Sequence, residues 1–147
     1  MVNTNLQVRW RLVILLLGLA LVGCSGNIRL PSTVPVKGIV HYQGKPAPGI
    51  RVKFHPQFDM GKIKFVPLGE TGADGSFTLS TGAPNNGTPQ GDYIVTFEKP
   101  VVAPAKTTNY IETEIDAFGG AYSDPSKSGF KVTIPQSGNS LPIFELK

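Results

Sequence analysis

The chain has 147 residues and a formal net charge of +4. This length suits one domain with a modest core. Its lysines are scattered, with no basic cluster interleaved with aromatic residues, which argues against a nucleic-acid-binding protein. The single cysteine excludes a disulfide within one chain.

An apolar run of eleven residues, 12–22 (LVILLLGLALV), follows the basic residues Arg9 and Arg11. As a helix this run would span about 16 Å, roughly half of the hydrocarbon core of a bilayer. A basic segment followed by a short apolar run is typical of a secretory signal peptide. The sequence therefore predicts a cleaved signal rather than a transmembrane helix. Without Arg9 and Arg11 the chain keeps twelve basic and ten acidic side chains, so it is close to neutral.

The only cysteine ends the segment Leu21-Val22-Gly23-Cys24, which resembles the lipobox of bacterial lipoproteins. This resemblance implies that the Cys24 thiol carries a diacylglyceryl thioether, that the signal is cut between Gly23 and Cys24, and that the new amine is acylated. Two or more acyl chains anchor a protein stably to a membrane, whereas one chain is marginal. The alternative is an ordinary free cysteine at the end of a signal peptide.

The residue after the cysteine bears on which membrane the protein reaches. Lipoproteins retained in the inner membrane commonly carry aspartate at this position, and this chain has Ser25. By resemblance to that sorting rule, the outer membrane is favoured over the inner membrane. The expected organisation is a signal peptide at residues 1–23, a lipidated tether at residues 24–33 and one folded domain at residues 34–147.

Apolar and polar residues alternate with period two in several short segments of the remaining chain, as in half-buried antiparallel strands. The alternation predicts strands over residues 36–42, 50–55, 76–80, 93–98, 130–134 and 144–146. Residues 100–128 are less regular, and within them residues 111–115 fit either a short strand or a helical turn. These features predict an all-β fold, an antiparallel β-sandwich of about seven strands, with no second domain.

Turn-forming residues separate the predicted strands. They are Gly44-Lys45-Pro46, Asp74-Gly75, Asn85-Asn86-Gly87, Gly91-Asp92 and Ser137-Gly138-Asn139. The strongest hairpin signal is Asp74-Gly75, because both residues tolerate the positive φ of a tight primed turn.

The order of these segments resembles the carboxypeptidase regulatory-like domains, which open with V-x-G-x-V, G-x-P and G-x-x-V-x-F-x-P. The matching segments are residues 36–40, 44–46 and 49–56, followed by TGADGSFTL at 71–79 and GDYIVTF at 91–97. One departure is Gly72-Ala73, where members of the family often carry Thr-Asp, so hydrogen bonding at that turn differs.

Later segments are similar to small lipoproteins of this type that are abundant in planctomycete-like bacteria. They are Tyr122-Ser123-Asp124, Ser128-Gly129-Phe130, Val132 and Phe144-Glu145-Leu146. The resemblance implies a transthyretin-like (prealbumin-like) sandwich. A glycine inside a predicted strand, Gly38, would allow a bulge or a close backbone approach there.

Metal sites have little support in the sequence. His41 and His55 are the only histidines, on the polar side of two strands expected to be neighbours, and a zinc or copper site needs three or four ligands. Glu112, Glu114 and Asp116 would align on one side of a strand without the loop that calcium sites require. Two solvated histidines and a solvated acidic edge are therefore expected, with no cofactor.

Enzymatic activity has equally little support. The chain has no G-x-S-x-G elbow for a nucleophilic serine. It ends in Ile143-Phe144-Glu145-Leu146-Lys147 rather than the Tyr-Arg-Gly-Ser signature of the hydroxyisourate hydrolases. The spacing of two tyrosines and two histidines that binds iron in intradiol dioxygenases is missing. The sequence predicts a protein that is not an enzyme.

Aromatic residues outside the alternating pattern are the candidate ligand contacts, above all Tyr110, Phe118 and Tyr122. Exposed rings on the loops of a sandwich can stack on sugars or anchor a protein partner. The alternative is that these rings fold back over the ends of the sandwich as an extension of the core. The expected function is a lipid-anchored, non-catalytic module of the bacterial envelope. It would be structural or would bind proteins, with carbohydrate binding as the alternative and a metal protein or enzyme as the third possibility.

Overall fold

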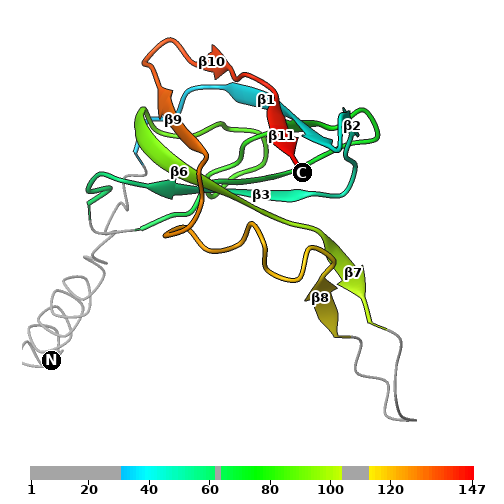
Figure 1. The fold of residues 1–147 in the computed structure, drawn as a ribbon. Coiled ribbons are helices and arrows are strands. Elements are labelled where there is room, and N and C mark those ends of the chain that lie inside the picture. The colour runs from blue at the N-terminus through cyan, green and yellow to red at the C-terminus, as the bar shows by residue number, and fades with distance from the viewer. Residues whose placement is uncertain (1–30, 62–63, 104–112) are drawn as a thin grey trace, which may run out of the picture.

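The computed structural model describes residues 31–61, 64–103 and 113–147, and these residues form eleven short β-strands and no helix (Figure 1). The prediction of an all-β fold is confirmed. No helix in the described part of the chain has the length and apolar character to cross a membrane.

The first sheet is built around β1 (Val36–Tyr42). Along one edge, β10 (Asn139–Ser140) and β11 (Phe144–Leu146) pair with β1 in parallel. Along the other edge, β2 (Lys45–Pro46) and β5 (Ser76–Thr78) pair with it antiparallel. Strands from the end of the sequence therefore supply the hydrogen-bonding partners along one edge of β1.

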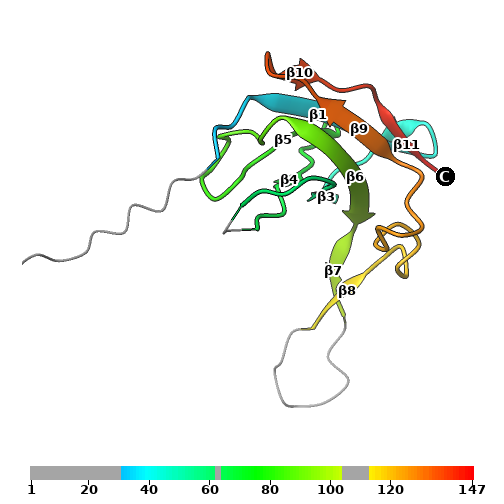
Figure 2. The same cartoon turned by 90° about the vertical axis from the view of Figure 1, so that its left-hand side faces the viewer.

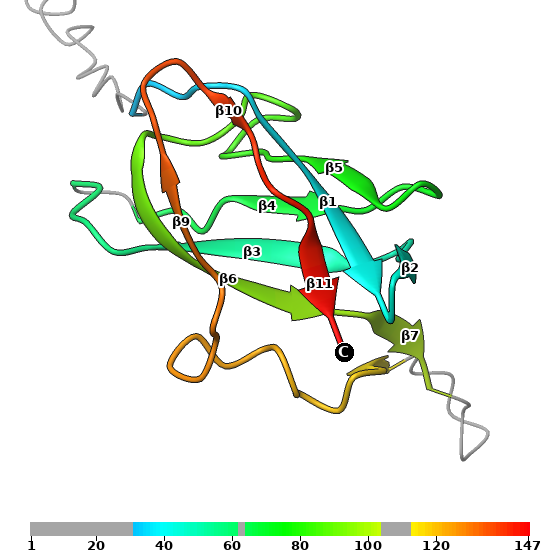
Figure 3. The ribbon, with the colours of Figure 1, turned by 45° about the horizontal axis from the view of Figure 1, so that its top comes forward.

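The second sheet has four antiparallel strands in the order β4-β3-β6-β9. Their bounds are Leu68–Glu70 for β4, Arg51–Pro56 for β3, Gly91–Glu98 for β6 and Lys131–Ile134 for β9. In Figure 3 the strands β1 and β11 lie in front of β3 and β6, so the two larger sheets form two layers.

A two-stranded ribbon extends from the end of β6. It consists of β7 (Pro100–Val102) and β8 (Glu114–Asp116), paired antiparallel, and Figure 2 shows it pointing away from the two larger sheets. Val102 and Ile115 on this ribbon are 60% and 49% exposed, so it adds little to the core.

The inward faces of the two larger sheets share one core. Period-two alternation buries Val36 and Val40 of β1 and Val52 and Phe54 of β3 completely. Rings from both layers meet in it: the centroids of Phe54 and Phe77 are 6.3 Å apart. Those of Phe97 and Phe144 are 5.3 Å apart. Burial of these side chains is the main force that holds the layers together.

Gly38 explains how Phe77 fits between the layers. A Cβ at residue 38 would lie 2.5 Å from Cζ of Phe77. The glycine in the middle of β1 therefore makes room for the ring of Phe77, whereas the prediction was a bulge or a close approach of backbone; the register around Gly38 is regular.

Two turns differ from the sequence prediction. The turn after β1 has positive φ at Gln43 and Gly44, so it lies one residue earlier than Gly44-Lys45-Pro46, and Lys45–Pro46 is already strand β2. At Asp74-Gly75 the prediction of a primed turn is wrong, because only Gly75 has positive φ. Its N–H donates to the carbonyl of Gly72 at 2.9 Å, which closes a three-residue loop with the glycine in the left-handed position.

All six predicted strands are present, with ends shifted by up to two residues. The strands that were not predicted, β2, β4, β7 and β10, have two or three residues each, too few to show an alternation. Of the ambiguous segment 111–115, residues 114 and 115 lie in the strand β8. Residues 117–123 form turns.

Candidate functional site

The predicted lipidation site Cys24, the cleavage site between Gly23 and Cys24, and Tyr110 lie outside the described residues, so they stay predictions. The described chain begins at Pro31, close to the start of β1. There the N–H of Val34 donates to the carbonyl of Thr88 at 2.9 Å. This bond fixes the point at which the chain enters the first sheet.

The two histidines are not neighbours, so the expectation of adjacent strands is wrong. His41 lies on β1 and its Nδ1 is 2.8 Å from the carboxylate of Glu145 on β11. His55 lies on β3 in the other sheet, with Nε2 2.8 Å from Oγ1 of Thr96. The chain switches sheets between β2 and β3, which alternation alone does not reveal.

The environment of His55 favours its neutral form. Partial burial lowers the pKa of His55, the charge of Lys53 lowers it further, and Glu98 opposes the shift. Glu98 is itself held by Lys53, whose Nζ lies 2.7 Å from one carboxylate oxygen and 2.8 Å from the other. Within residues 31–61, 64–103 and 113–147, no three His, Cys, Asp or Glu side chains form a group that could hold a metal ion.

Asp116 is not part of a solvated acidic edge, contrary to the prediction. Its Oδ1 accepts the backbone N–H of Lys99 at 2.9 Å and that of Phe118 at 3.0 Å, and its Oδ2 accepts that of Gly120 at 3.0 Å. Partial burial alone would raise the pKa of Asp116, but these three N–H groups and the charge of Lys53 together lower it. Asp116 therefore organises the turn that follows β8.

Glu114 and Glu112 complete the predicted acidic segment. Glu114 points to Arg51, with Nη2 and Oε2 3.4 Å apart. Glu112 lies outside the described residues. Because Glu114 faces an arginine and Asp116 faces backbone donors, these two carboxylates do not act together on one ligand.

Phe118 and Tyr122, predicted as ligand contacts, form an aromatic cluster with Tyr42. The rings of Phe118 and Tyr122 are T-shaped, with centroids 5.3 Å apart, and those of Tyr42 and Phe118 are 5.2 Å apart. All three side chains are half-buried and pack against the core. The hydroxyl of Tyr122 donates to the carbonyl of Lys147, which attaches the end of β11 to the cluster.

A hollow of about 340 Å³ opens beside this cluster, at the end of β1 where the chain turns into β2. We call it the distal hollow. Its lining residues are Tyr42, Gln43, Lys45, Pro46, Ala47, Pro48, Ile50, Lys99 and Phe118. The lining contains two aromatic rings and two lysines and no carboxylate.

Sequence reasoning selects Phe118 for this region and misses Tyr42, Lys45 and Lys99 as its neighbours. Tyr42 follows the alternation of β1, which assigns it to the core. Lys45 and Lys99 are far apart in the sequence and match no motif. A tyrosine at the last position of a strand, just before a turn, is the one signal in the sequence that a ring lies near the end of the sheet.

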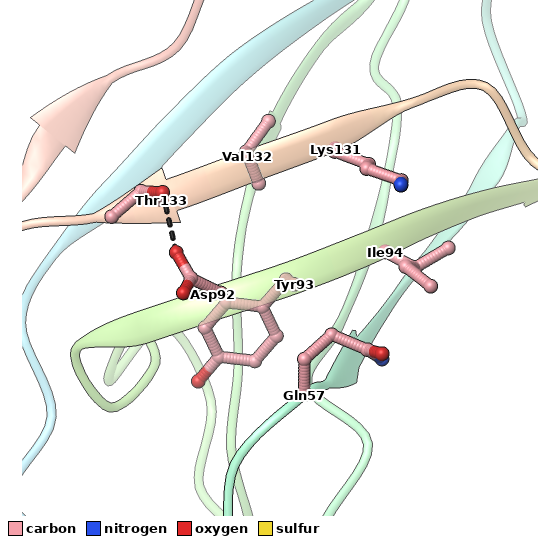
Figure 4. Close-up of a pocket in the computed structure, with 7 residues that line it drawn as sticks. All are labelled: Gln57, Asp92, Tyr93, Ile94, Lys131, Val132 and Thr133. Atoms are coloured by element: carbon pink, nitrogen blue, oxygen red, sulfur yellow. Dashed lines mark hydrogen bonds between the residues drawn. The ribbon is translucent and has the colours of Figure 1, made fainter.

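A second hollow lies on the outer face of the second sheet (Figure 4). Its lining residues are Gln57, Asp92, Tyr93, Ile94, Lys131, Val132 and Thr133. Among these lining residues the hydroxyl of Thr133 donates to the carboxylate of Asp92 at 2.5 Å. Figure 4 shows the ring of Tyr93 among the lining residues, but its hydroxyl is bound in the interior. This hollow therefore offers mixed polar groups and no exposed aromatic ring.

The hydroxyl of Tyr93 belongs to a buried network. It donates to the carbonyl of Pro89 at 2.8 Å and accepts the hydroxyl of Thr88 at 2.9 Å. Burial raises the pKa of Tyr93, and the bond to Thr88 opposes the shift. Tyr93 thus has a structural role and is not available to a ligand.

No known family profile matches the chain. No curated protein matches it either. Among solved structures, a 9R-lipoxygenase from Cyanothece PCC8801 is similar over 78% of this chain, with 13% identity and a TM-score of 0.43. This chain spans 16% of the length of that enzyme. A second similar structure is the dioxygenase domain of a dioxygenase carbohydrate-binding protein fusion from the cellulolytic bacterium Streptomyces sp. SirexAA-E. The similarity covers 82% of this chain and 85% of that domain, with 20% identity and a TM-score of 0.35.

Proposed function

We propose that this chain is a lipid-anchored, non-catalytic module of a bacterial envelope. The single observation that carries the proposal is the segment Leu21-Val22-Gly23-Cys24 directly after a basic segment and an apolar run of eleven residues. The acylated Cys24 would hold the protein at a membrane surface, with the outer membrane favoured. Its mechanism is positional: the tether fixes the location, and the folded domain presents surfaces to partners.

The fold supports a tethered module of the transthyretin-like sandwich type. Two layers share one core, and β1 begins twelve residues after Cys24, a length of chain that reaches at most about 43 Å. The distal hollow lies at the other end of β1, seven residues and roughly 20 Å further on. In Figure 1 the start of β1 and the turn into β2 lie at opposite ends of the first sheet. The predicted tether would therefore join the domain at the end of the first sheet opposite to the hollow.

The polar side chains support a binding role over a catalytic one. His55 and Asp116 are bound by groups of the fold, the first by the Thr96 hydroxyl and the second by backbone N–H groups. His41 pairs with Glu145 at the surface, and neither residue lines the distal hollow or the hollow on the second sheet. A general acid and base must both reach the same substrate atom or its neighbours. What the surface offers instead is exposed apolar residues on the β7–β8 ribbon and rings at the distal hollow.

These two surfaces correspond to the two candidate roles. Val101, Val102 and Ile115 on the ribbon favour binding of a protein, because a protruding two-stranded ribbon with exposed apolar side chains offers both backbone edges and contact area. The rings and lysines of the distal hollow favour the alternative, binding of a carbohydrate.

The tether is tested by expressing the full chain and its Cys24→Ala variant in a bacterium that processes lipoproteins. The expected wild-type product lies in the membrane fraction, and its intact mass corresponds to a chain starting at Cys24 plus a diacylglyceryl group and an acyl group. The Cys24→Ala product should keep residues 1–23 and carry no lipid. A wild-type product that is released by washing without detergent, or that retains the first 23 residues, would contradict the proposal.

A further inference from the structure

We propose that the distal hollow binds a sugar unit that carries a carboxylate, such as a uronic acid within an envelope polysaccharide. The inference rests on the carbohydrate-binding alternative of the proposed function and adds the chemical class of the ligand. Three features of the hollow support it: its charge, its rings and the way its walls are fixed.

The residues that line the hollow carry positive charge only. Lys45 and Lys99 line it, and no carboxylate does. Neither lysine forms an ion pair with a residue in the described ranges, whereas Lys53 and Lys127 do. A neighbouring carboxylate, that of Asp116, binds the backbone N–H groups of Lys99 and Phe118 and offsets one of the two positive charges, but it does not line the hollow. Two cationic groups beside one small hollow favour an anionic ligand.

The rings of the hollow favour a sugar over a simple anion. Tyr42 and Phe118 lie side by side, with a tilt of 46° between their planes, and both remain partly exposed. Aromatic faces at a surface provide a large apolar contact area with little loss of side-chain entropy. A pyranose ring has apolar C–H faces and a polar rim, so a uronic acid combines the face that suits the rings with the charge that suits the lysines.

The walls of the hollow are fixed before any ligand arrives. On one side the Thr71 hydroxyl donates to the carbonyl of Ala47 at 2.6 Å and accepts the N–H of Ile50 at 2.8 Å, both in the interior. On the other side the carboxylate of Asp116 holds the N–H of Phe118. A preformed site loses less entropy on binding, which increases its affinity for a small ligand.

The test uses the full-length protein, purified in detergent with its anchor, and three probes of equal length. The probes are trigalacturonic acid, its neutral counterpart galactotriose, and triglutamate, each titrated by calorimetry. We expect trigalacturonic acid to bind about tenfold or more tightly than either of the others. Lys45→Gln and Lys99→Gln should each weaken its binding by about tenfold, since each removes one charge-assisted contact.

One control variant and one variant of the aromatic wall make the outcome specific. Lys37→Gln removes an exposed lysine from the other end of β1 and should leave the affinity unchanged. Phe118→Leu keeps an apolar side chain but removes the ring, so it should weaken the binding of trigalacturonic acid and of galactotriose by the same factor. Thermal melting verifies that every variant is folded.

Three results would overturn the inference. They are the absence of trigalacturonic acid binding, equal binding of triglutamate, which would indicate an acidic peptide as ligand, and an equal loss with Lys37→Gln, which would indicate unspecific charge attraction. None of these results alters the membrane fractionation or the intact mass, so a failure here is distinguishable from a failure of the proposed tether.

Discussion

Phe77 lies between two glycines that belong to different sheets. A Cβ at Gly38 of β1 would come within 2.5 Å of its ring, and one at Gly69 of β4 would come within 3.1 Å of the ring and 2.8 Å of the carbonyl of Thr78. Phe77 contacts Phe54 and Phe144 from this position. Two residues without side chains therefore make room for one ring that links both layers.

Gly38→Ala should destabilise the fold by about 1–3 kcal/mol, because the added methyl group forces the ring of Phe77 out of its place in a packed core. Urea unfolding of the full chain in detergent measures the change. Gly129→Ala is the matched control, since no atom lies within 4 Å of the point that its methyl group would occupy and its φ is not positive. Equal stability of the two variants would show that the ring has room to move.

At the scale of single elements, the turn after β8 depends on one carboxylate. Asp116 accepts three backbone N–H groups, and Gly119 and Gly120 both have positive φ, so the chain folds tightly around it. This turn places Phe118 against Tyr42. The position of an aromatic wall of the distal hollow therefore depends on the ionised state of Asp116.

Asp116→Asn should loosen this turn, since the amide side chain has one acceptor oxygen and no charge for three donors. Hydrogen exchange should become faster at the N–H groups of Phe118 and Gly120, while the strands β3 and β6 keep their protection. The control Asp124→Asn should affect only the neighbourhood of Ser126, to which Asp124 is bound. Unchanged exchange at Phe118 would contradict the role of Asp116.

The pH dependence of the wild-type turn follows from the lowered pKa of Asp116. A carboxyl whose folded pKa lies below its unfolded value stabilises the fold at neutral pH. That contribution begins to be lost below roughly pH 4 and disappears as the pH falls through the folded pKa. The protection of the N–H groups of Phe118 and Gly120, expressed relative to the intrinsic exchange rate at each pH, should therefore also fall in the wild-type chain at low pH.

At the scale of the whole molecule, the two larger sheets have no separate cores. Phe54 of β3 contacts Tyr93 in its own sheet, with centroids 5.7 Å apart, and Phe77 in the other sheet. Phe97 of β6 contacts Phe144 of β11 in the same way. Because each layer buries its apolar face only against the other, the two layers should unfold as one unit.

Phe54→Ala should cost about 3–5 kcal/mol, because it removes a fully buried ring and leaves a cavity between the layers. Amide exchange during urea unfolding should show β1 and β6 of this variant losing protection at the same urea concentration, and this concentration should be lower than in the wild-type chain. Ile143→Ala is the control: this side chain is 48% exposed, so its loss should cost about 0.5 kcal/mol or less. Separate transitions for β1 and β6 would contradict a shared core.

Alternation predicts the strands of the fold wherever one face is buried and the other is polar, as in Arg51–Pro56. It could not predict β4, because Leu68 is 50% exposed and the buried position is a glycine, Gly69. The ring of Phe77 fills the space that a side chain at residue 69 would occupy. Nor could it predict β7, where Val101 and Val102 are both exposed. In both cases tertiary contacts set the pattern, and these are absent from local sequence.

The candidate site was predictable only in part. Phe118 and Tyr122 stand out as aromatic residues in an irregular segment, and they do lie together. Their packing against Tyr42, and the lysines beside them, depend on how β1, β2 and the turn after β8 meet. Which strand belongs to which sheet decides these contacts, and alternation does not reveal it. For the same reason the sequence wrongly placed His41 and His55 on neighbouring strands.

The parallel pairing of β1 with β11 has a consequence for the order of folding. β1 is the first strand of the domain, and the N–H of Gln43 at its end donates to the carbonyl of Leu146. A polypeptide that emerges from a ribosome amino end first therefore leaves one edge of β1 without its partner strands until residues 139–146 have been synthesised. Such distant partners slow the acquisition of structure, so the first sheet closes late in folding.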